Sequence, residues 1–180
     1  ILLVGGYYAY INFVKNPQVE KAVAEMYQAE MQFERDSFSQ ALTNPGGGFP
    51  GFLDIIDEYG GTKTGKLAKY YAGICYLNLG SFDEAIEYLN EFKTSDETLR
   101  VTKFGALADA YAEIGESENA EKHYKKAIEA GDIESVSSIY MERLALLHMK
   151  NGKKDEAKKL FENLKKKYPQ STAAREADKY

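Results

Sequence analysis

Apolar and small residues return at helical spacing in three related stretches between Lys66 and Pro169. In each stretch a ring side chain stands four residues before a glycine, and an alanine stands five residues after it. The glycines are Gly80, Gly115 and Gly152, so the steps between them are 35 and 37 residues. A pattern of this period predicts repeated helical hairpins, each with a first helix, a turn at the glycine and a second helix.

The residues around each glycine predict how the two helices of a hairpin pack. Small residues allow close approach, and a large side chain opposite fills the remaining space. The glycine is expected in the left-handed conformation that often ends a helix. Capping boxes are expected at Ser81-x-x-Glu84 and Thr94-x-x-Glu97. The matched positions are Ala72-Gly73, Leu107-Ala108 and Leu144-Ala145 for the small pair, Tyr76, Tyr111 and His148 for the ring, Ala85, Ala120 and Ala157 for the alanine, and Leu89, Tyr124 and Phe161 four residues later.

This combination resembles the tetratricopeptide repeat (TPR) family, whose unit is 34 residues long. Alignment on the glycines gives repeats of about 66–99, 101–134 and 138–171. The chain departs from the family pattern at His148, in a late alanine that is present only as Ala127, and in a terminal proline present only as Pro169. The resemblance implies an all-α fold, a right-handed solenoid of stacked helical hairpins, with residues 172–180 as its capping helix.

Residues 1–15 open in the middle of a hydrophobic run, which is too short by itself to cross a bilayer. We interpret it as the C-terminal part of a transmembrane helix, with tyrosines in the aromatic belt where the helix leaves the lipid. This predicts a single-pass anchor and a repeat domain in the periplasm. The alternative is a buried amphipathic helix that packs on the repeats. The expected anchor residues are Ile1, Leu2, Leu3, Val4, Tyr7, Tyr8 and Tyr10.

Residues 16–65 are expected to form a leading helical hairpin that resembles a degenerate repeat. A long helix is predicted from Val19 to Leu42, and a short helix is predicted over residues 52–59. The Gly- and Pro-rich stretch 43–51 between them reads as an inserted loop. One broad apolar face of the long helix is expected to hold Val19, Val23, Met26, Tyr27, Met31, Phe33 and Phe38.

Charge and candidate chemistry argue against catalysis. The net charge of −5 makes nucleic acid an unsuitable partner for the whole surface. Residues 60–66 have the spacing of a phosphate-binding loop, but Leu67 replaces the required Ser or Thr and no strand pattern precedes them, so an inter-helix turn is predicted. His123, His148 and Cys75 are expected to be structural, and no metal or cofactor site is predicted. Eight lysines between Lys150 and Lys167 predict a solvated face, or else a surface for an anionic partner or lipid.

The TPR resemblance implies that the first helices line a groove that binds an extended or helical peptide. This groove would be apolar at one end and acidic in the middle. The acidic side chains would repel the acidic C-termini that some TPR co-chaperones bind. The positions carried over are Leu67, Tyr70, Ile74, Leu77 and Asn78 in the first repeat, Asp109 and Glu113 in the second with Thr102, and Glu142, Leu146 and Met149 in the third with Ile139.

The resulting functional expectation is a membrane-anchored scaffold or adaptor that binds other proteins and is not an enzyme. Its layout is similar to single-span bacterial TPR proteins at the periphery of the Sec translocon, which work beside a periplasmic chaperone of the prolyl-isomerase type. Those resemblances imply a translocon and a chaperone as partners, with the bilayer contacted through the N-terminal helix. The alternative is an assembly factor for an outer-membrane or surface-secretion machine.

Overall fold

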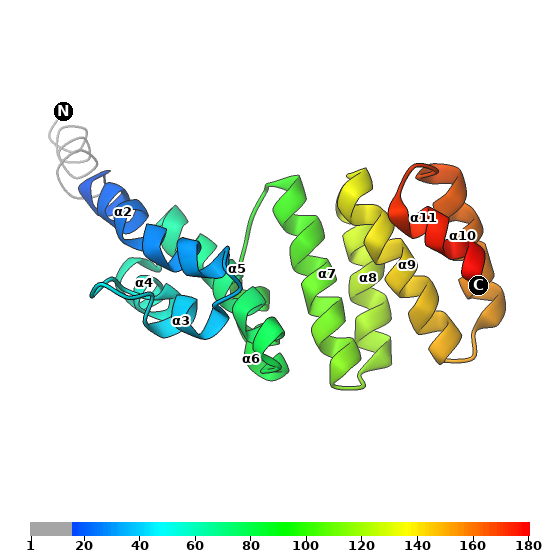
Figure 1. Cartoon of the computed structure of the whole chain (residues 1–180), viewed down its shortest axis with the longest axis horizontal. Coiled ribbons are helices and arrows are strands. Elements are labelled where there is room, and N and C mark those ends of the chain that lie inside the picture. Colours follow the sequence, from blue (N-terminus) through cyan, green and yellow to red (C-terminus); the bar gives the residue numbers. More distant parts are fainter. Residues whose placement is uncertain (1–15) are drawn as a thin grey trace, which may run out of the picture. The chain divides into compact units, whose positions relative to one another are not determined.

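The computed structural model describes residues 16–180, which form helices joined by short turns (Figure 1). No strand occurs in this range. The expected membrane anchor, residues 1–15, lies outside the described residues. Within the described part of the chain, every helix is too short or too polar to span a membrane.

The chain divides into two compact units, one ending at Lys93 and the other beginning at Thr94. The first unit contains α2 (Asn16–Phe33), α3 (Phe38–Thr43), α4 (Phe52–Tyr59), α5 (Lys63–Leu79) and α6 (Phe82–Glu91). The second contains α7 (Glu97–Glu113), α8 (Ser117–Ala130), α9 (Glu134–Lys150), α10 (Lys154–Lys167), α11 (Thr172–Glu176) and the 3-10 helix η2 (Ala177–Lys179).

The single helix expected from Val19 to Leu42 is wrong, because the chain breaks between α2 and α3. Asp36 has φ of 56° there, a left-handed conformation that interrupts the helical hydrogen bonds. The expected broad apolar face is also wrong in part. Val23 and Tyr27 are each 56% exposed. The buried stripe consists instead of Ala22, Met26 and Ala29, which recur at the helical period and let α2 lie close to its neighbours.

The core of the first unit lies where α2, α3 and α4 pack against α5. Phe52 is fully buried and its ring stacks on that of Tyr71, with centroids 5.0 Å apart. The second helix of the hairpin, α6, packs on the other side of α5. A Cβ added to Gly73 would stand 2.6 Å from Leu89 Cγ, so this glycine permits the close approach predicted for the small pair.

Helix ends follow the predicted turn chemistry at the glycines but not at the capping boxes. Gly80, Gly115 and Gly152 have φ of 78°, 81° and 76°, which confirms the left-handed conformation. Neither predicted capping box forms. Ser81 precedes α6 but its side chain makes no cap hydrogen bond there. Helix α7 begins two residues later than the Thr94 box requires, because Asp96 accepts a 2.8 Å hydrogen bond from the Leu99 N–H.

In the second unit, α7 pairs with α8, and α9 pairs with α10 (Figure 1). Val101, Ala108, Tyr124 and Leu144 are buried between α7, α8 and α9. The approach of α9 to α7 depends on Gly105, since a Cβ there would stand 1.9 Å from the ring of Tyr140. Ala108, Tyr124 and Leu144 are positions that the repeat pattern matched, whereas the close approach of Gly105 to Tyr140 was not predicted.

The C-terminal segment 172–180, expected as a capping helix, forms α11 and η2. Ser171 begins α11 by accepting a 3.1 Å hydrogen bond from the Ala174 N–H. Alanines of this segment pack with α9 and α10 in one buried cluster. That cluster contains Met141, Ala145, Ala157, Phe161, Leu164, Tyr168, Ala173, Ala174 and Ala177. The short segment covers part of α10.

Candidate functional site

The predicted groove positions of the first unit lie on α5 and divide into two groups. Leu67 packs against the core, and the ring of Tyr70 lies 5.3 Å from that of Phe92. Ile74 and Leu77 are half-buried and belong to no buried cluster of the described residues. Exposed Asn78 follows them, and its Nδ2 donates a 2.8 Å hydrogen bond to the carbonyl of Ile74. We call Ile74, Leu77 and Asn78 the α5 face.

The acidic middle expected from Asp109 and Glu113 is partly neutralised. Glu113 is exposed, but Asp109 accepts a 2.6 Å hydrogen bond from the Tyr124 hydroxyl and forms an ion pair with Arg143 of α9. Burial raises the pKa of the Asp109 carboxyl, while Arg143 and the Tyr124 hydroxyl oppose that rise. Sequence analysis missed Arg143, although it lies 34 residues after Asp109, which is one repeat further along the chain.

The predicted positions of α9 lie beside the C-terminal segment. Leu146 packs against the cluster that contains the alanines of α11. Burial raises the pKa of the Glu142 carboxyl, and the nearby charge of Glu176 raises it further. Ile139 and Met149 are each 38% exposed. The α9 side chains therefore contribute to the surface between α9, α10 and the C-terminal segment, while Asp109 is engaged by Arg143.

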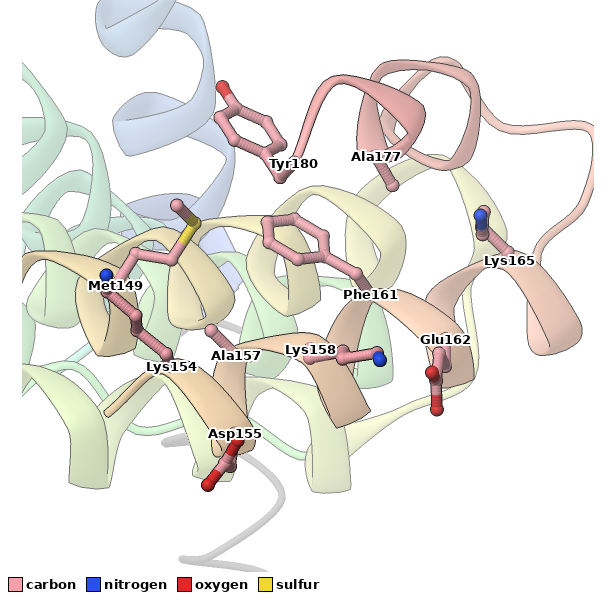
Figure 2. Close-up of a pocket in the computed structure, with 10 residues that line it drawn as sticks. All are labelled: Met149, Lys154, Asp155, Ala157, Lys158, Phe161, Glu162, Lys165, Ala177 and Tyr180. Carbon is pink, nitrogen blue, oxygen red and sulfur yellow. The ribbon is translucent and has the colours of Figure 1, made fainter. Parts of the chain in front are cut away.

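Met149 lines a groove of about 580 Å³, and Figure 2 shows the side chains that line it. Its apolar floor includes the ring of Phe161, on which the ring of Tyr180 stacks at 5.1 Å with 8° between the planes. The remaining lining residues are Lys154, Asp155, Ala157, Lys158, Glu162, Lys165 and Ala177. We call this the α10 groove. Sequence analysis identified the lysine-rich segment but not the groove, because the groove depends on how much of α10 the last helix covers.

The side chains considered for chemistry have structural environments. His123 Nδ1 lies 2.8 Å from the Asn119 carbonyl and its ring stacks on Tyr111 at 5.1 Å. His148 is buried, and burial lowers the pKa of its imidazole. Burial raises the pKa of the Cys75 thiol to about 12. Over residues 16–180, no three His, Cys, Asp or Glu side chains are grouped as a metal site requires.

Of residues 60–66, which have the spacing of a phosphate-binding loop, residues 60–62 form the predicted turn between α4 and α5, and residues 63–66 begin α5. Thr62 begins α5 by accepting a 3.0 Å hydrogen bond from the Gly65 N–H. A Cβ on Gly65 would stand 2.1 Å from the Tyr59 carbonyl oxygen, so the backbone of α4 fills the space beside this glycine. The turn follows a helix rather than a strand, which is the wrong context for a phosphate-binding loop.

Comparison with known proteins gives the same repeat assignment. One tetratricopeptide repeat model matches residues 67–96 and 141–171, and a second matches residues 104–130. A comparison with curated proteins finds no significant match. The crystal structure of MamA protein is similar, with a TM-score of 0.68, 19% identity, and coverage of 88% of this chain and 79% of that chain. TPR-like repeats of a Podosopora anserina protein described as a kinesin light chain give a TM-score of 0.67 at 16% identity, covering 87% and 81%.

The matched segments cover the later part of the first helix and all of the second helix in each of the hairpins α5–α6, α7–α8 and α9–α10. The structural neighbours support an all-α, TPR-like helical solenoid. Repeats of this class present surfaces that bind other proteins. The repeat matches, the packing positions and the structural similarity together support a tetratricopeptide repeat protein, with matched repeats at residues 67–96, 104–130 and 141–171.

Proposed function

We propose that this protein is a scaffold that binds a partner protein through the α5 face. The observation that carries the proposal is the state of Ile74 and Leu77, which are half-exposed and outside the core of their unit. Covering such side chains is worth about 25 cal/mol per Å² of apolar area before the costs of association. Exposed Asn78 beside them offers a polar group that can orient a bound segment.

The proposed action is binding without catalysis or a cofactor. Cys75, a candidate nucleophile, is buried with a raised pKa. The two histidines are also buried, and they belong to packing positions of α8 and α9. These environments favour a role in stability for each of the three side chains.

We further propose that residues 1–15 anchor the repeats to a membrane of the bacterial envelope, with the repeat domain in the periplasm. The support is the apolar run at Ile1–Val4 followed by Tyr7, Tyr8 and Tyr10. An ancillary role at the translocon, beside a periplasmic chaperone, is the specific form of this proposal. Alkaline extraction of membranes tests the anchor, because a membrane-spanning segment keeps the chain in the pellet and a peripheral chain is released.

The test of the α5 face is affinity capture from detergent-solubilised membranes with Leu77→Asp. Leu79→Asp is the matched control, because Leu79 is 46% exposed on the same helix and was not predicted to lie in the groove. We expect Leu77→Asp to lose the partners that the unchanged chain and the control retain, with the helical circular dichroism of all three alike. Retained capture by Leu77→Asp would show that the α5 face is not the binding surface.

A further inference from the structure

Helix α10 is covered over only part of its length. The 14 residues of α8 pack against the 17-residue α9, whereas the 14 residues of α10 meet the five residues of α11 and three of η2. At the usual rise per residue, α10 is about 21 Å long and the covering segment is about 13 Å long. Within the described residues, about one and a half turns of α10 are therefore left without a covering helix, and the α10 groove lies there (Figure 2).

The α10 groove combines an apolar floor with a basic rim. Met149 and Tyr180 are 38% and 59% exposed beside the Phe161 ring. Lys154 and Lys158 have no hydrogen bond or ion pair with any of the described residues, in contrast to Lys165, Lys153 and Lys167, which pair with Asp178, Glu121 and Asp132. A concave apolar floor between cationic side chains fits a helix that carries exposed apolar residues between acidic ones.

Two acidic residues also line the groove, but they do not close it to such a helix. Figure 2 shows the carboxylates of Asp155 and Glu162 pointing away from the Phe161 and Tyr180 rings. Lys154 and Lys158 therefore line the groove without an ion-pair partner among the described residues, although the Lys158 amine points toward the side of Glu162 (Figure 2). A second α10 groove is an unsuitable occupant, because two rims of lysines would face each other.

Helix α2 of this same chain carries the complementary surface. Val23 and Tyr27 are each 56% exposed and stand four residues apart, so they form an apolar pair on one face of α2. Glu20 and Glu30 stand three residues before and after this pair, so the four share one face at helical spacing. Neither glutamate forms an ion pair within the described part of the chain. We call Glu20, Val23, Tyr27 and Glu30 the α2 stripe.

We propose that the α2 stripe of one copy docks in the α10 groove of a second copy. The apolar pair of the stripe covers Met149, Phe161 and Tyr180, and its glutamates approach the unpaired lysines of the rim. Because the two surfaces differ, the contact is head-to-tail and leaves a free stripe and a free groove at the ends of each pair. The contact does not use Ile74 or Leu77, so it is independent of the α5 face.

Sedimentation velocity of the 180-residue chain over a range of concentrations tests the proposal, in a mild detergent that covers the apolar run of residues 1–15. We expect association that grows with concentration and weakens as salt screens the charges. Val23→Lys and Lys158→Glu each lower the association constant by about tenfold or more. Gln18→Lys and Lys159→Glu are matched controls with the same changes of charge on exposed residues of the same helices. Gln18 is neither three nor four residues from any member of the α2 stripe, and Lys159 is about 100° from Lys158 around the axis of α10. Both controls are expected to associate as the unchanged chain does.

A mixture of the two disrupted chains distinguishes head-to-tail contact from other modes of association. Val23→Lys keeps an intact groove and Lys158→Glu keeps an intact stripe. We therefore expect the mixture to form a one-to-one dimer that does not grow further. If the chain without substitutions stays monomeric, the proposal is overturned, even if the α10 groove binds a helix of another protein. Single variants that still associate, controls that fail equally, or a mixture that stays monomeric overturn it too.

Discussion

The ion pair between Asp109 and Arg143 links the first helices of two neighbouring repeats, and its removal gives a sharp prediction. The Asp109 side chain is 21% exposed and that of Arg143 is 45% exposed. Breaking a fully buried pair costs about 3–5 kcal/mol, whereas exposed pairs are worth about 0–1 kcal/mol. For this half-buried pair we expect Arg143→Met to lower the free energy of unfolding by about 1–2 kcal/mol at pH 7. Arg143→Met also removes the guanidinium that lies 5.7 Å from the centroid of the Tyr140 ring, while methionine keeps an apolar side chain at this position.

The deficit of Arg143→Met depends on pH in a direction set by Asp109. Burial raises the pKa of this carboxyl in the folded state, and Arg143 opposes the rise. Loss of the guanidinium therefore raises that pKa further. A carboxyl whose pKa is higher in the folded state binds a proton more readily there, so the folded variant gains stability as the pH falls through that pKa. The deficit should accordingly shrink as the pH falls from 7 toward 4.

Urea unfolding at several pH values, followed by circular dichroism, measures both effects. Asp109→Asn combined with Arg143→Met is the control, because it removes the titrating carboxyl along with its partner. We expect the pH dependence of the deficit to disappear in this double variant. A deficit of the same size at pH 7 and pH 4, or no deficit at pH 7, would refute the electrostatic account of the pair.

Two further predictions concern packing. Gly105→Ala places a methyl group against the Tyr140 ring. The cost of overpacking, about 1–3 kcal/mol, should outweigh a gain in helix propensity of up to about 1 kcal/mol. Urea unfolding should therefore show a lower free energy of unfolding, and an unchanged value would contradict the close approach of α7 and α9. Cys75 is fully buried, and burial raises the pKa of its thiol to about 12. A thiol reagent should therefore react with Cys75 only as the chain unfolds. Prompt reaction of the folded chain would contradict this burial.

The parts of the fold that sequence analysis predicted depend on local backbone and packing rules. A glycine at the end of a first helix is recognisable because a left-handed residue there favours glycine, and Gly80, Gly115 and Gly152 all have positive φ. Small residues opposite large ones were also recognisable, as Gly73 against Leu89 shows. These rules act within one hairpin, so the repeated pattern was sufficient to locate the hairpins.

The features that sequence analysis missed depend on competition between neighbouring residues that could each cap a helix or occupy its buried face. Asp96 rather than Thr94 begins α7, although both residue types can cap a helix. Val23 and Tyr27 were expected in the core because they are large and apolar, but the alanines on the adjacent face of α2 are the residues that are buried. Apolar character alone did not distinguish the buried face from the exposed stripe.

Contacts between neighbouring repeats can be predicted from the length of the repeat. Within the second unit, Asp109 pairs with Arg143 at a separation of 34 residues, and the Tyr168 hydroxyl donates to Asp132 at a separation of 36. Lys153 pairs with Glu121 at a separation of 32. Residues about one repeat apart lie side by side, so complementary charges at that spacing predict pairs that periodicity within one helix does not reveal.

The central claim is that partners bind the α5 face, and site-specific photo-crosslinking tests it most directly. A photoreactive phenylalanine derivative is placed at Leu77 in one chain and at Leu79 in another, because both positions lie near the end of α5 and only Leu77 belongs to the α5 face. We expect light to join another protein to position 77 and not to position 79. No adduct at position 77, or equal adducts at both positions, would contradict the claim.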